Sequence, residues 1–364
     1  MSFNYIPVHA IKGRGAASLM AHRFRKDVRE GFDDGWEGLD QQAQTQAEKP
    51  PLATQVIFEN VRSAISTNDS PDIFFETSIN PYRGCEHGCV YCFARPTHSY
   101  LDLSPGLDFE TRIIAKRNIA DVLAGELARR GYKPGLLNIG SVTDCYQPVE
   151  RELLLTRSVI EVLGKARHPY SLLSKSSGVE RDIDLIAADA YSKRSAVYIS
   201  ITTLDPRLAR ILEPRAAAPA RRLRTVRALA DAGIPVGVSV APQIPFINVD
   251  MEQVLEAARE AGAQSAFYTV LRLPWEVNPI FKEWLQLHYP DRAARVMARV
   301  REMRGGKDYD SDWATRMKGS GQWAELLAQR FAKTCARLGL NRVRREFDFS
   351  HFRPAGVDGQ ESLF

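Results

Sequence analysis

The sequence predicts an α/β protein whose centre is a partial (β/α)6 barrel, with an irregular N-terminal extension and a helical C-terminal extension. Short apolar, β-branched segments alternate with amphipathic helical segments along the middle of the chain. Such alternation is typical of repeated βα units and a parallel sheet. Six strand-like segments are present, fewer than the eight that close a full barrel. A doubly wound open sheet remains the alternative.

The predicted elements follow one another from residue 72. The first strand-like segment, DIFFETSIN (72–80), leads into a group of cysteines, and apolar residues then recur at helical spacing over 119–127. The remaining strand-like segments are 136–143, 170–176, 196–202, 235–241 and 265–273. In both candidate architectures, functional groups gather in the loops at the carboxyl ends of the strands.

Three regions are expected along the chain. Residues 1–71 are rich in Gly, Asp, Gln and Pro and weak in periodicity, which favours loops with short helices. Residues 72–289 form the predicted barrel. Residues 290–364 form a C-terminal extension in which WAELLAQRFAKTCARLGL reads as a helix, followed by a partly ordered tail.

The composition is that of an ordinary globular protein, with 44% hydrophobic and 26% charged residues. The N-terminus MSFNYIPVHAIKGRGAASL lacks the apolar core of a secretory signal, and no run of about 18 apolar residues could span a bilayer. We therefore expect a cytoplasmic protein without a membrane partner. Five cysteines, three of them within eight residues, suit thiolate ligands in a reducing compartment.

The segment RGCEHGCVYCFAR carries Cys85, Cys89 and Cys92 at C-x3-C-x2-C spacing. Thiolates this close repel one another unless a cation or cluster neutralises them. Zinc would add His87 or His98, but structural zinc sites usually join two separated ligand arms, and the chain has no second C-x2-C or histidine pair. Iron–sulfur clusters are held by cysteine thiolates, normally four. Three would leave one iron open, which suits a catalyst, and His87 would then be a loop residue.

The cysteine spacing, with the aromatic Tyr91 before the last cysteine, resembles the signature of the radical S-adenosylmethionine superfamily. The resemblance covers roughly residues 72–275. It implies a [4Fe-4S] cluster on Cys85, Cys89 and Cys92, whose open iron is chelated by the amino and carboxylate groups of S-adenosylmethionine. It also implies a one-electron reductant of the flavodoxin or ferredoxin type, and a 5′-deoxyadenosyl radical that abstracts hydrogen from a substrate.

The segment NIGSVTDCYQPVE follows the second strand-like segment. The Gly-Gly-Glu common in the superfamily is absent there, and Ser141, Thr143 and Asp144 instead resemble a segment of the spore photoproduct lyases. The resemblance implies that these oxygens accept the ammonium of S-adenosylmethionine. The alternative is a turn and helix N-cap. Tyr91 is expected to present its backbone to the adenine.

Further matches to the lyases are Lys175 and Ser200. The resemblance implies that Lys175 pairs with the methionine carboxylate and that Ser200 binds carboxylate or ribose. A solvated lysine and a buried strand serine are the alternatives. A cysteine of the lyases returns hydrogen to the product radical, but the matching position here is Ser141. Cys145, on the other side of Asp144, is the candidate donor or else a small buried hydrophobe.

A basic stretch follows the fourth strand-like segment and makes nucleic acid a candidate partner. Its members are Arg207, Arg210, Arg215, Arg221, Arg222, Arg224 and Arg227. The alternative is a solvated helix face. Three functions remain open: a radical enzyme acting on a nucleic-acid lesion, a radical enzyme acting on an unrelated small molecule or peptide, and a non-enzymatic Fe–S or zinc protein.

Overall fold

The computed structural model describes residues 9–24, 52–343 and 345–354. A seven-stranded sheet in the order β10-β9-β8-β7-β6-β3-β2 forms its centre. All neighbours pair in parallel except β2, which is antiparallel to β3. The strands are β2 (Ile65–Thr67), β3 (Thr77–Ile79), β6 (Leu137–Ile139), β7 (Tyr170–Ser174), β8 (Ser195–Ser200), β9 (Val236–Ser239) and β10 (Ser265–Phe267).

A second, smaller sheet has the order β1-β5-β4. Its strands are β1 (Gln55–Glu59), β4 (Tyr82–Arg83) and β5 (Arg112–Lys116). Strand β1 runs parallel to β5, whereas β4 runs antiparallel to it. Because β4 ends where the cysteine segment begins, this small sheet fixes the start of that segment.

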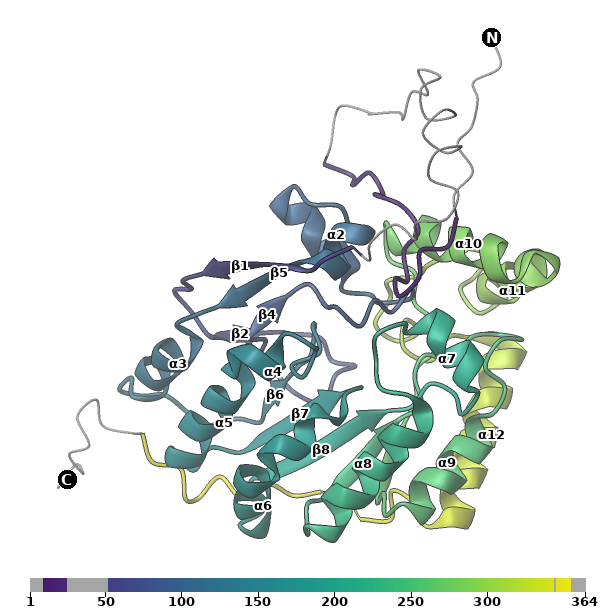
Figure 1. The fold of residues 1–364 in the computed structure, drawn as a ribbon. Helices are drawn as coiled ribbons and strands as arrows, with labels where there is room; N and C mark the ends of the chain where they lie inside the picture. Colours follow the sequence, from purple (N-terminus) through teal and green to yellow (C-terminus); the bar gives the residue numbers. More distant parts are fainter. Residues whose placement is uncertain (1–8, 25–51, 344, 355–364) are drawn as a thin grey trace.

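Helices α5, α6, α8 and α9 cover one face of the large sheet (Figure 1). The helices are η1 (Arg95–Leu101), α2 (Leu107–Thr111), α3 (Ile119–Leu127), α4 (Glu150–Leu153), α5 (Leu155–Lys165), η2 (Ser177–Asp182), α6 (Ile183–Tyr191), α7 (Pro206–Leu212), α8 (Pro219–Asp231), α9 (Met251–Glu260), α10 (Val277–His288), α11 (Pro290–Glu302) and α12 (Gly321–Leu338). The main apolar core lies between this layer and the sheet, where Leu172, Val197 and Val238 are fully buried. A second core joins α7, α10 and α11 to the cysteine segment.

The predicted mixed α/β fold with a parallel sheet is confirmed. Six parallel strands fall within or overlap the six strand-like segments, although most are shorter than predicted. No pairing joins the two edge strands β10 and β2 within the described part of the chain. The sheet is therefore open, and a partial (β/α)6 barrel stays a prediction.

Residues 52–71 differ from the expectation of loops with short helices. They contain β1 and β2, because Val56, Ile57 and Ile65 lie in extended segments that pair with strands further along the chain. Residues 25–51, which carry much of the predicted irregular segment, lie outside the described residues. The predicted helix near the C-terminus is α12. The boundaries at residues 71 and 289 stay predictions.

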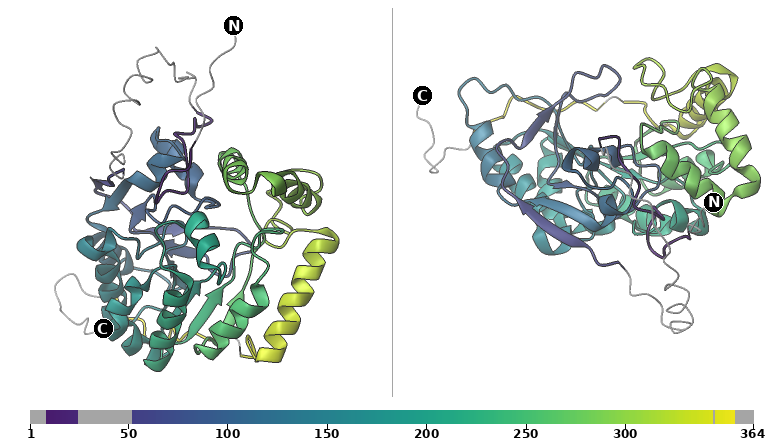
Figure 2. Two further views of the ribbon diagram at one scale, coloured as in Figure 1. Left: turned by 45° about the vertical axis from the view of Figure 1, so that its right-hand side comes forward. Right: turned by 90° about the horizontal axis from the view of Figure 1, so that it is seen from above.

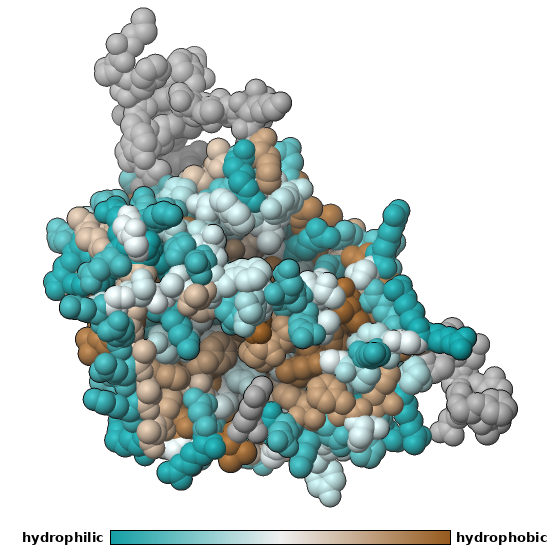
Figure 3. All heavy atoms as spheres, turned by 180° about the vertical axis from the view of Figure 1, so that it is seen from behind, coloured by the Kyte–Doolittle hydropathy of each residue, from teal (hydrophilic) through white to brown (hydrophobic). Residues whose placement is uncertain are grey.

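The far face of the molecule, opposite the helices in Figure 1, shows apolar side chains gathered at its middle and polar ones around them (Figure 3).

A separate feature is a cavity of about 560 Å³ lined by the starts of β8, β9 and β10 and by residues near Asn341. This cavity lies at the amino ends of these strands, so it is separate from the carboxyl ends where a functional site is expected. None of the described helices is both long and apolar enough to cross a lipid bilayer.

Residues 9–24 run between α2 and α10 (Figure 2). Their anchor is a buried ion pair between Arg95 and Glu110, which lie 2.5 Å apart and are fully excluded from solvent. Glu110 also accepts hydrogen bonds from the backbone N–H groups of Gly15 and Ala16, at 3.0 and 2.9 Å. A Cβ on Gly15 would lie 1.8 Å from the Gly88 carbonyl oxygen, so the close approach of the two backbones requires glycine there.

We predict that Glu110→Gln destabilises the apoprotein by about 3 kcal/mol, because it leaves the buried Arg95 without its counter-charge. The matched control is Glu302→Gln, which removes a half-exposed carboxylate from its pair with Arg299 and should cost less than about 1 kcal/mol. Urea unfolding of both variants measures the difference. Equal losses of unfolding free energy in the two variants would contradict this role of the pair.

Candidate functional site

The three cysteines lie on the loop between β4 and η1. Gly84 and Gly88 have φ values of 79° and 67°, a left-handed backbone that glycine adopts without strain. The loop packs against α2, where the Cys85 N–H donates to the Phe109 carbonyl at 2.9 Å. Cys85 and Cys89 are buried and Cys92 is partly buried.

Arg95 fixes the far half of this loop. Its guanidinium donates to the carbonyl oxygens of Cys89, at 2.9 Å, and Gly88, at 3.1 Å, in addition to pairing with Glu110. Sequence reasoning missed both members of this pair. Arg95 is part of the quoted cysteine segment, but nothing in the spacing pattern distinguishes a buried arginine from a solvated one.

Burial raises the pKa of all three thiols, to about 12 for Cys89. For Cys85, the nearby Asp144 carboxylate and then the Cys89 and Cys92 thiols raise the pKa further. The thiols are therefore protonated at neutral pH, and a metal centre bound there would have to displace their protons. In a cubane cluster each cysteine binds its own iron. The donor set thus fits such a cluster, and no three His, Cys, Asp or Glu side chains of the described residues form a single-ion site.

Asp144 organises the loop after β6. Its carboxylate accepts hydrogen bonds from the Ser174 hydroxyl at 2.7 Å, the Lys175 N–H at 2.6 Å and the Tyr146 N–H at 3.0 Å. Burial alone would raise the pKa of Asp144, but the His87 ring and these hydrogen bonds hold it well below its ordinary value. The ionised carboxylate therefore joins the ends of β6 and β7.

His87 is more than the loop residue that the sequence predicts. Its side chain is buried, and Nδ1 lies 3.2 Å from Asp144 Oδ2, although the contact lacks ordinary hydrogen-bond geometry. His98, the other histidine considered as a zinc ligand, contacts the Arg112 carbonyl through Nε2 at 3.0 Å. Burial lowers the pKa of His98 to about 4. The two histidines therefore have separate packing environments.

Asn80, at the end of β3, holds Ser141 and Thr143 in place. Its amide nitrogen donates to the Ser141 hydroxyl at 3.1 Å, and its oxygen accepts from the Val142 N–H at 2.9 Å. The Thr143 hydroxyl donates to the Tyr82 carbonyl at 3.1 Å. Sequence reasoning missed Asn80. Its position directly before Pro81, at the end of the first strand-like segment, was the available indication.

Tyr91 belongs to a buried polar network around Glu213. The Tyr91 hydroxyl donates to the Glu213 carboxylate, Arg222 pairs with the same carboxylate, and the Thr202 hydroxyl donates to it at 2.6 Å. Burial would raise the pKa of Glu213, but Arg222 and then Lys175 lower it to about 2. Arg222, predicted as part of a basic surface stretch, is thus an internal counter-ion. Glu213 was missed because a lone acid among arginines reads as surface charge.

Lys175 lies beside this network. Its Nζ is 6.0 Å from the centroid of the Tyr91 ring. Burial would lower its pKa, but Cys89 and Glu213 raise the pKa above its ordinary value, so the side chain is a cation. In the described part of the chain its ammonium makes no hydrogen bond, which distinguishes it from the paired Arg222. Ser200 ends β8, is buried and lies opposite Ser239 of β9.

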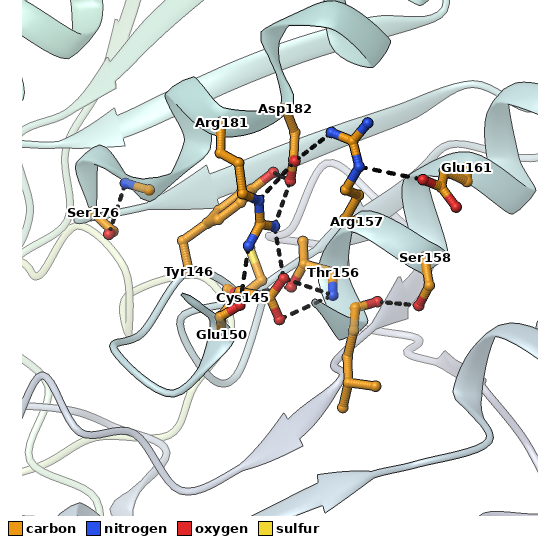
Figure 4. Close-up of polar contacts among 12 residues, drawn as sticks. Cys145, Tyr146, Glu150, Thr156, Arg157, Ser158, Glu161, Ser176, Arg181 and Asp182 are labelled. Carbon is orange, nitrogen blue, oxygen red and sulfur yellow. Dashed lines mark hydrogen bonds and ion pairs between the residues drawn. The ribbon is translucent and has the colours of Figure 1, made fainter. Parts of the chain in front are cut away.

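Cys145 belongs to the main apolar core. It is fully buried, and its Sγ lies 3.8 Å from the Leu173 carbonyl oxygen. Beside it, Tyr146 donates to Asp182, while Arg181 bridges Asp182 and Glu150 (Figure 4). This placement agrees with the alternative of a small buried hydrophobe, and hydrogen donation by Cys145 stays a prediction.

Comparisons with known proteins agree with these features. The sequence model of the Radical SAM superfamily matches residues 79–261. An uncharacterized protein of Mycobacterium tuberculosis is 34% identical over 270 residues, which cover 72% of this chain and 79% of that protein. An uncharacterized protein of Methanocaldococcus jannaschii is 27% identical over 215 residues, covering 58% of this chain and 76% of that protein.

Solved structures of spore photoproduct lyase have a similar fold. A mutant of that enzyme superposes with a TM-score of 0.50 at 17% identity, covering 83% of this chain and 89% of that one. Another mutant, with bound S-adenosylmethionine and dinucleoside spore photoproduct, gives a TM-score of 0.50 at 16% identity over the same shares. The superfamily match spans half of the chain and implies a [4Fe-4S] cluster and S-adenosylmethionine as cofactors. The chain therefore belongs to the radical S-adenosylmethionine superfamily.

Proposed function

We propose that this protein is a radical S-adenosylmethionine enzyme that binds its [4Fe-4S] cluster through Cys85, Cys89 and Cys92 and acts on a nucleic-acid lesion. When both cofactors are bound, one electron from a flavodoxin- or ferredoxin-type protein cleaves the C5′–S bond of S-adenosylmethionine, giving methionine and a 5′-deoxyadenosyl radical that takes a hydrogen atom from the substrate.

The observation that carries this proposal is a partly buried cation, without a hydrogen bond among the described residues, beside the thiols of the cysteine segment. Lys175 is held above Tyr91 and next to Cys89, and its charge is maintained by Glu213. A carboxylate is the natural partner of such an ammonium, because a charge-assisted hydrogen bond is strongest where water is excluded. The methionine carboxylate of S-adenosylmethionine supplies that partner next to the cluster.

The other predicted residues have distinct roles in the proposed site. Ser141 and Thr143, ordered by Asn80, present oxygen atoms to the methionine ammonium, and Ser200 contacts its carboxylate or the ribose. Asp144 is a positioning residue, because its carboxylate already accepts three hydrogen bonds and fixes the backbone of Lys175. Cys145 stays the candidate hydrogen donor of this proposal; its side chain is buried, and its Sγ lies 3.8 Å from the Leu173 carbonyl oxygen.

Exposed aromatic rings interleaved with arginines support a nucleic acid as substrate. Phe93, next to Cys92, lies beneath the Arg272 guanidinium at 5.1 Å. Arg23 lies over the rings of Trp275, at 4.3 Å, and Tyr100, at 5.2 Å. All three rings are at least 45% exposed. Proteins that bind unpaired bases use such rings for stacking, and the dinucleoside bound in the spore photoproduct lyase structure is a chemically similar ligand.

We expect the reconstituted protein, given dithionite and S-adenosylmethionine, to form 5′-deoxyadenosine, measured by liquid chromatography. Cys85→Ala, Cys89→Ala and Cys92→Ala should each lose the visible Fe–S absorbance and this product, because each removes one thiolate. Cys335→Ala, a buried cysteine of α12, is the matched control and should keep both. A fully loaded wild-type protein that forms no 5′-deoxyadenosine would refute the proposed function.

The substrate class is tested in the same assay by adding dinucleotide photoproduct. If 5′-deoxyadenosine forms only when the dinucleotide photoproduct is added, the result supports a nucleic-acid lesion as the substrate. If 5′-deoxyadenosine forms equally without it and the dinucleotide stays intact, the reaction belongs to an unrelated small molecule or peptide.

We predict that Lys175→Ala keeps the cluster but weakens S-adenosylmethionine binding tenfold or more, since it removes a charge-assisted hydrogen bond worth about 1.5–3 kcal/mol. Asp144→Asn should also weaken S-adenosylmethionine binding, but by a smaller factor, because it disturbs only the position of Lys175. Lys133→Ala, at an exposed lysine before the amino end of β6 and so at the opposite end of that strand from the site, is the control. Equilibrium dialysis on cluster-loaded protein measures the affinities, and equal affinity in Lys175→Ala and Lys133→Ala would exclude the proposed contact.

A further inference from the structure

A second pocket lies against the outer side of the cysteine loop. Its volume is about 220 Å³, several times the roughly 30 Å³ that one water molecule takes in the liquid. Its lining comes from the cysteine loop, from the segments after β6 and β7, and from residues 215–221, which run from the end of α7 into α8. The polar residues that line it are His87, Arg151, Ser176, Ser177, Arg215 and Arg221. None of the residues that line it carries a carboxylate.

Two of the lining arginines are held in place by acids behind the pocket wall. Arg215 pairs with the buried Glu86 at 3.1 Å, and Arg221 binds both carboxylate oxygens of Glu180. A guanidinium has five N–H donors, so each of these arginines retains donors after these contacts. The acids therefore orient the two arginines without using up all of their hydrogen-bonding capacity.

Arg151 supplies the uncompensated charge. It is exposed on α4, and within the described residues its side chain has no hydrogen-bond or ion-pair partner. Two hydroxyl groups add neutral donors. The Ser176 oxygen accepts the Gly178 N–H at 3.0 Å and keeps its own proton to donate, and the Ser177 hydroxyl is unpartnered in the same part of the structure. The pocket thus offers several donors and a net positive charge.

Two residues that line the pocket adjoin the proposed radical site. The His87 carbonyl accepts the Arg215 N–H at 3.2 Å, and the His87 ring contacts Asp144 on the other side of the loop. Ser176 directly follows Lys175. A ligand in the pocket would therefore be separated from the proposed site by a single layer of loop residues.

We propose that this pocket binds a phosphate group of the nucleic-acid substrate. Planar guanidinium groups match phosphate oxygens well, and a small concave pocket suits one phosphate and part of its sugar. A docking surface for an acidic electron donor would instead be broad and flat, since protein interfaces bury about 800 Å² on each partner. The identity of the phosphate as part of a nucleic acid rests on the proposed function; the anion site itself does not.

The test is calorimetric titration of the cluster-loaded protein with two probes, inorganic phosphate and a single-stranded thymidine oligonucleotide. Arg151→Ala should lower the affinity of the protein for both probes roughly tenfold or more, because it removes a charged hydrogen-bond donor. It should also reduce the salt dependence of oligonucleotide binding by about 0.7 in the log–log slope. Arg151→Lys should restore part of the affinity, and Ser177→Ala should weaken both probes by a smaller factor.

Arg130→Ala is the matched control, because Arg130 is also exposed and has no side-chain partner among the described residues. The proposal is overturned if the Arg151→Ala and Arg130→Ala proteins bind both probes equally. Binding of inorganic phosphate without the oligonucleotide would overturn the nucleic-acid source. Unchanged affinity for both probes with slower reduction by flavodoxin would assign the pocket to a protein partner instead. Formation of 5′-deoxyadenosine by the wild-type protein is scored separately, so failure of the proposed function is distinguishable from failure of this inference.

Discussion

The buried Arg95–Glu110 pair is the interaction on which the proposed site depends. The Arg95 guanidinium donates to four carbonyl oxygens, those of Gly88, Cys89, Pro105 and Gly106, as well as to Glu110. A charge taken wholly out of water is tolerated only when it is paired and its donors are satisfied. The hydrogen bonds that satisfy the Arg95 guanidinium also set the path of the loop between Cys89 and Cys92.

Two further groups of buried charge surround the thiols. Asp144 accepts hydrogen bonds from Ser174, Lys175 and Tyr146. Glu213 is satisfied by Arg222, Thr202 and Tyr91. Each acid is saturated by contacts within the protein. Lys175, between them, has no hydrogen bond among the described residues. The arrangement therefore concentrates unused hydrogen-bonding capacity on one cation next to Cys89, where a small anionic ligand would complete the network.

The strand positions and the cysteine loop could be predicted from the sequence because they depend on local patterns. Alternating apolar segments and C-x3-C-x2-C spacing are visible within a few residues of chain. Asn80, Glu110 and Glu213 could not be found in this way, since each acts on residues distant in sequence, such as Ala16 for Glu110. For the basic stretch after β8, a local pattern was visible in the sequence but predicted the wrong environment for some of its arginines. Its composition suggested one surface, whereas Arg222 is internal and Arg221 is paired with Glu180.

The contacts of residues 9–24 have a consequence for the order of events during synthesis. Gly15 and Ala16 leave the ribosome early, but their acceptor Glu110 follows 95 and 94 residues later. Arg23 pairs with Glu276, which is 253 residues further along the chain. The segment can therefore complete its contacts only after most of the protein has been made.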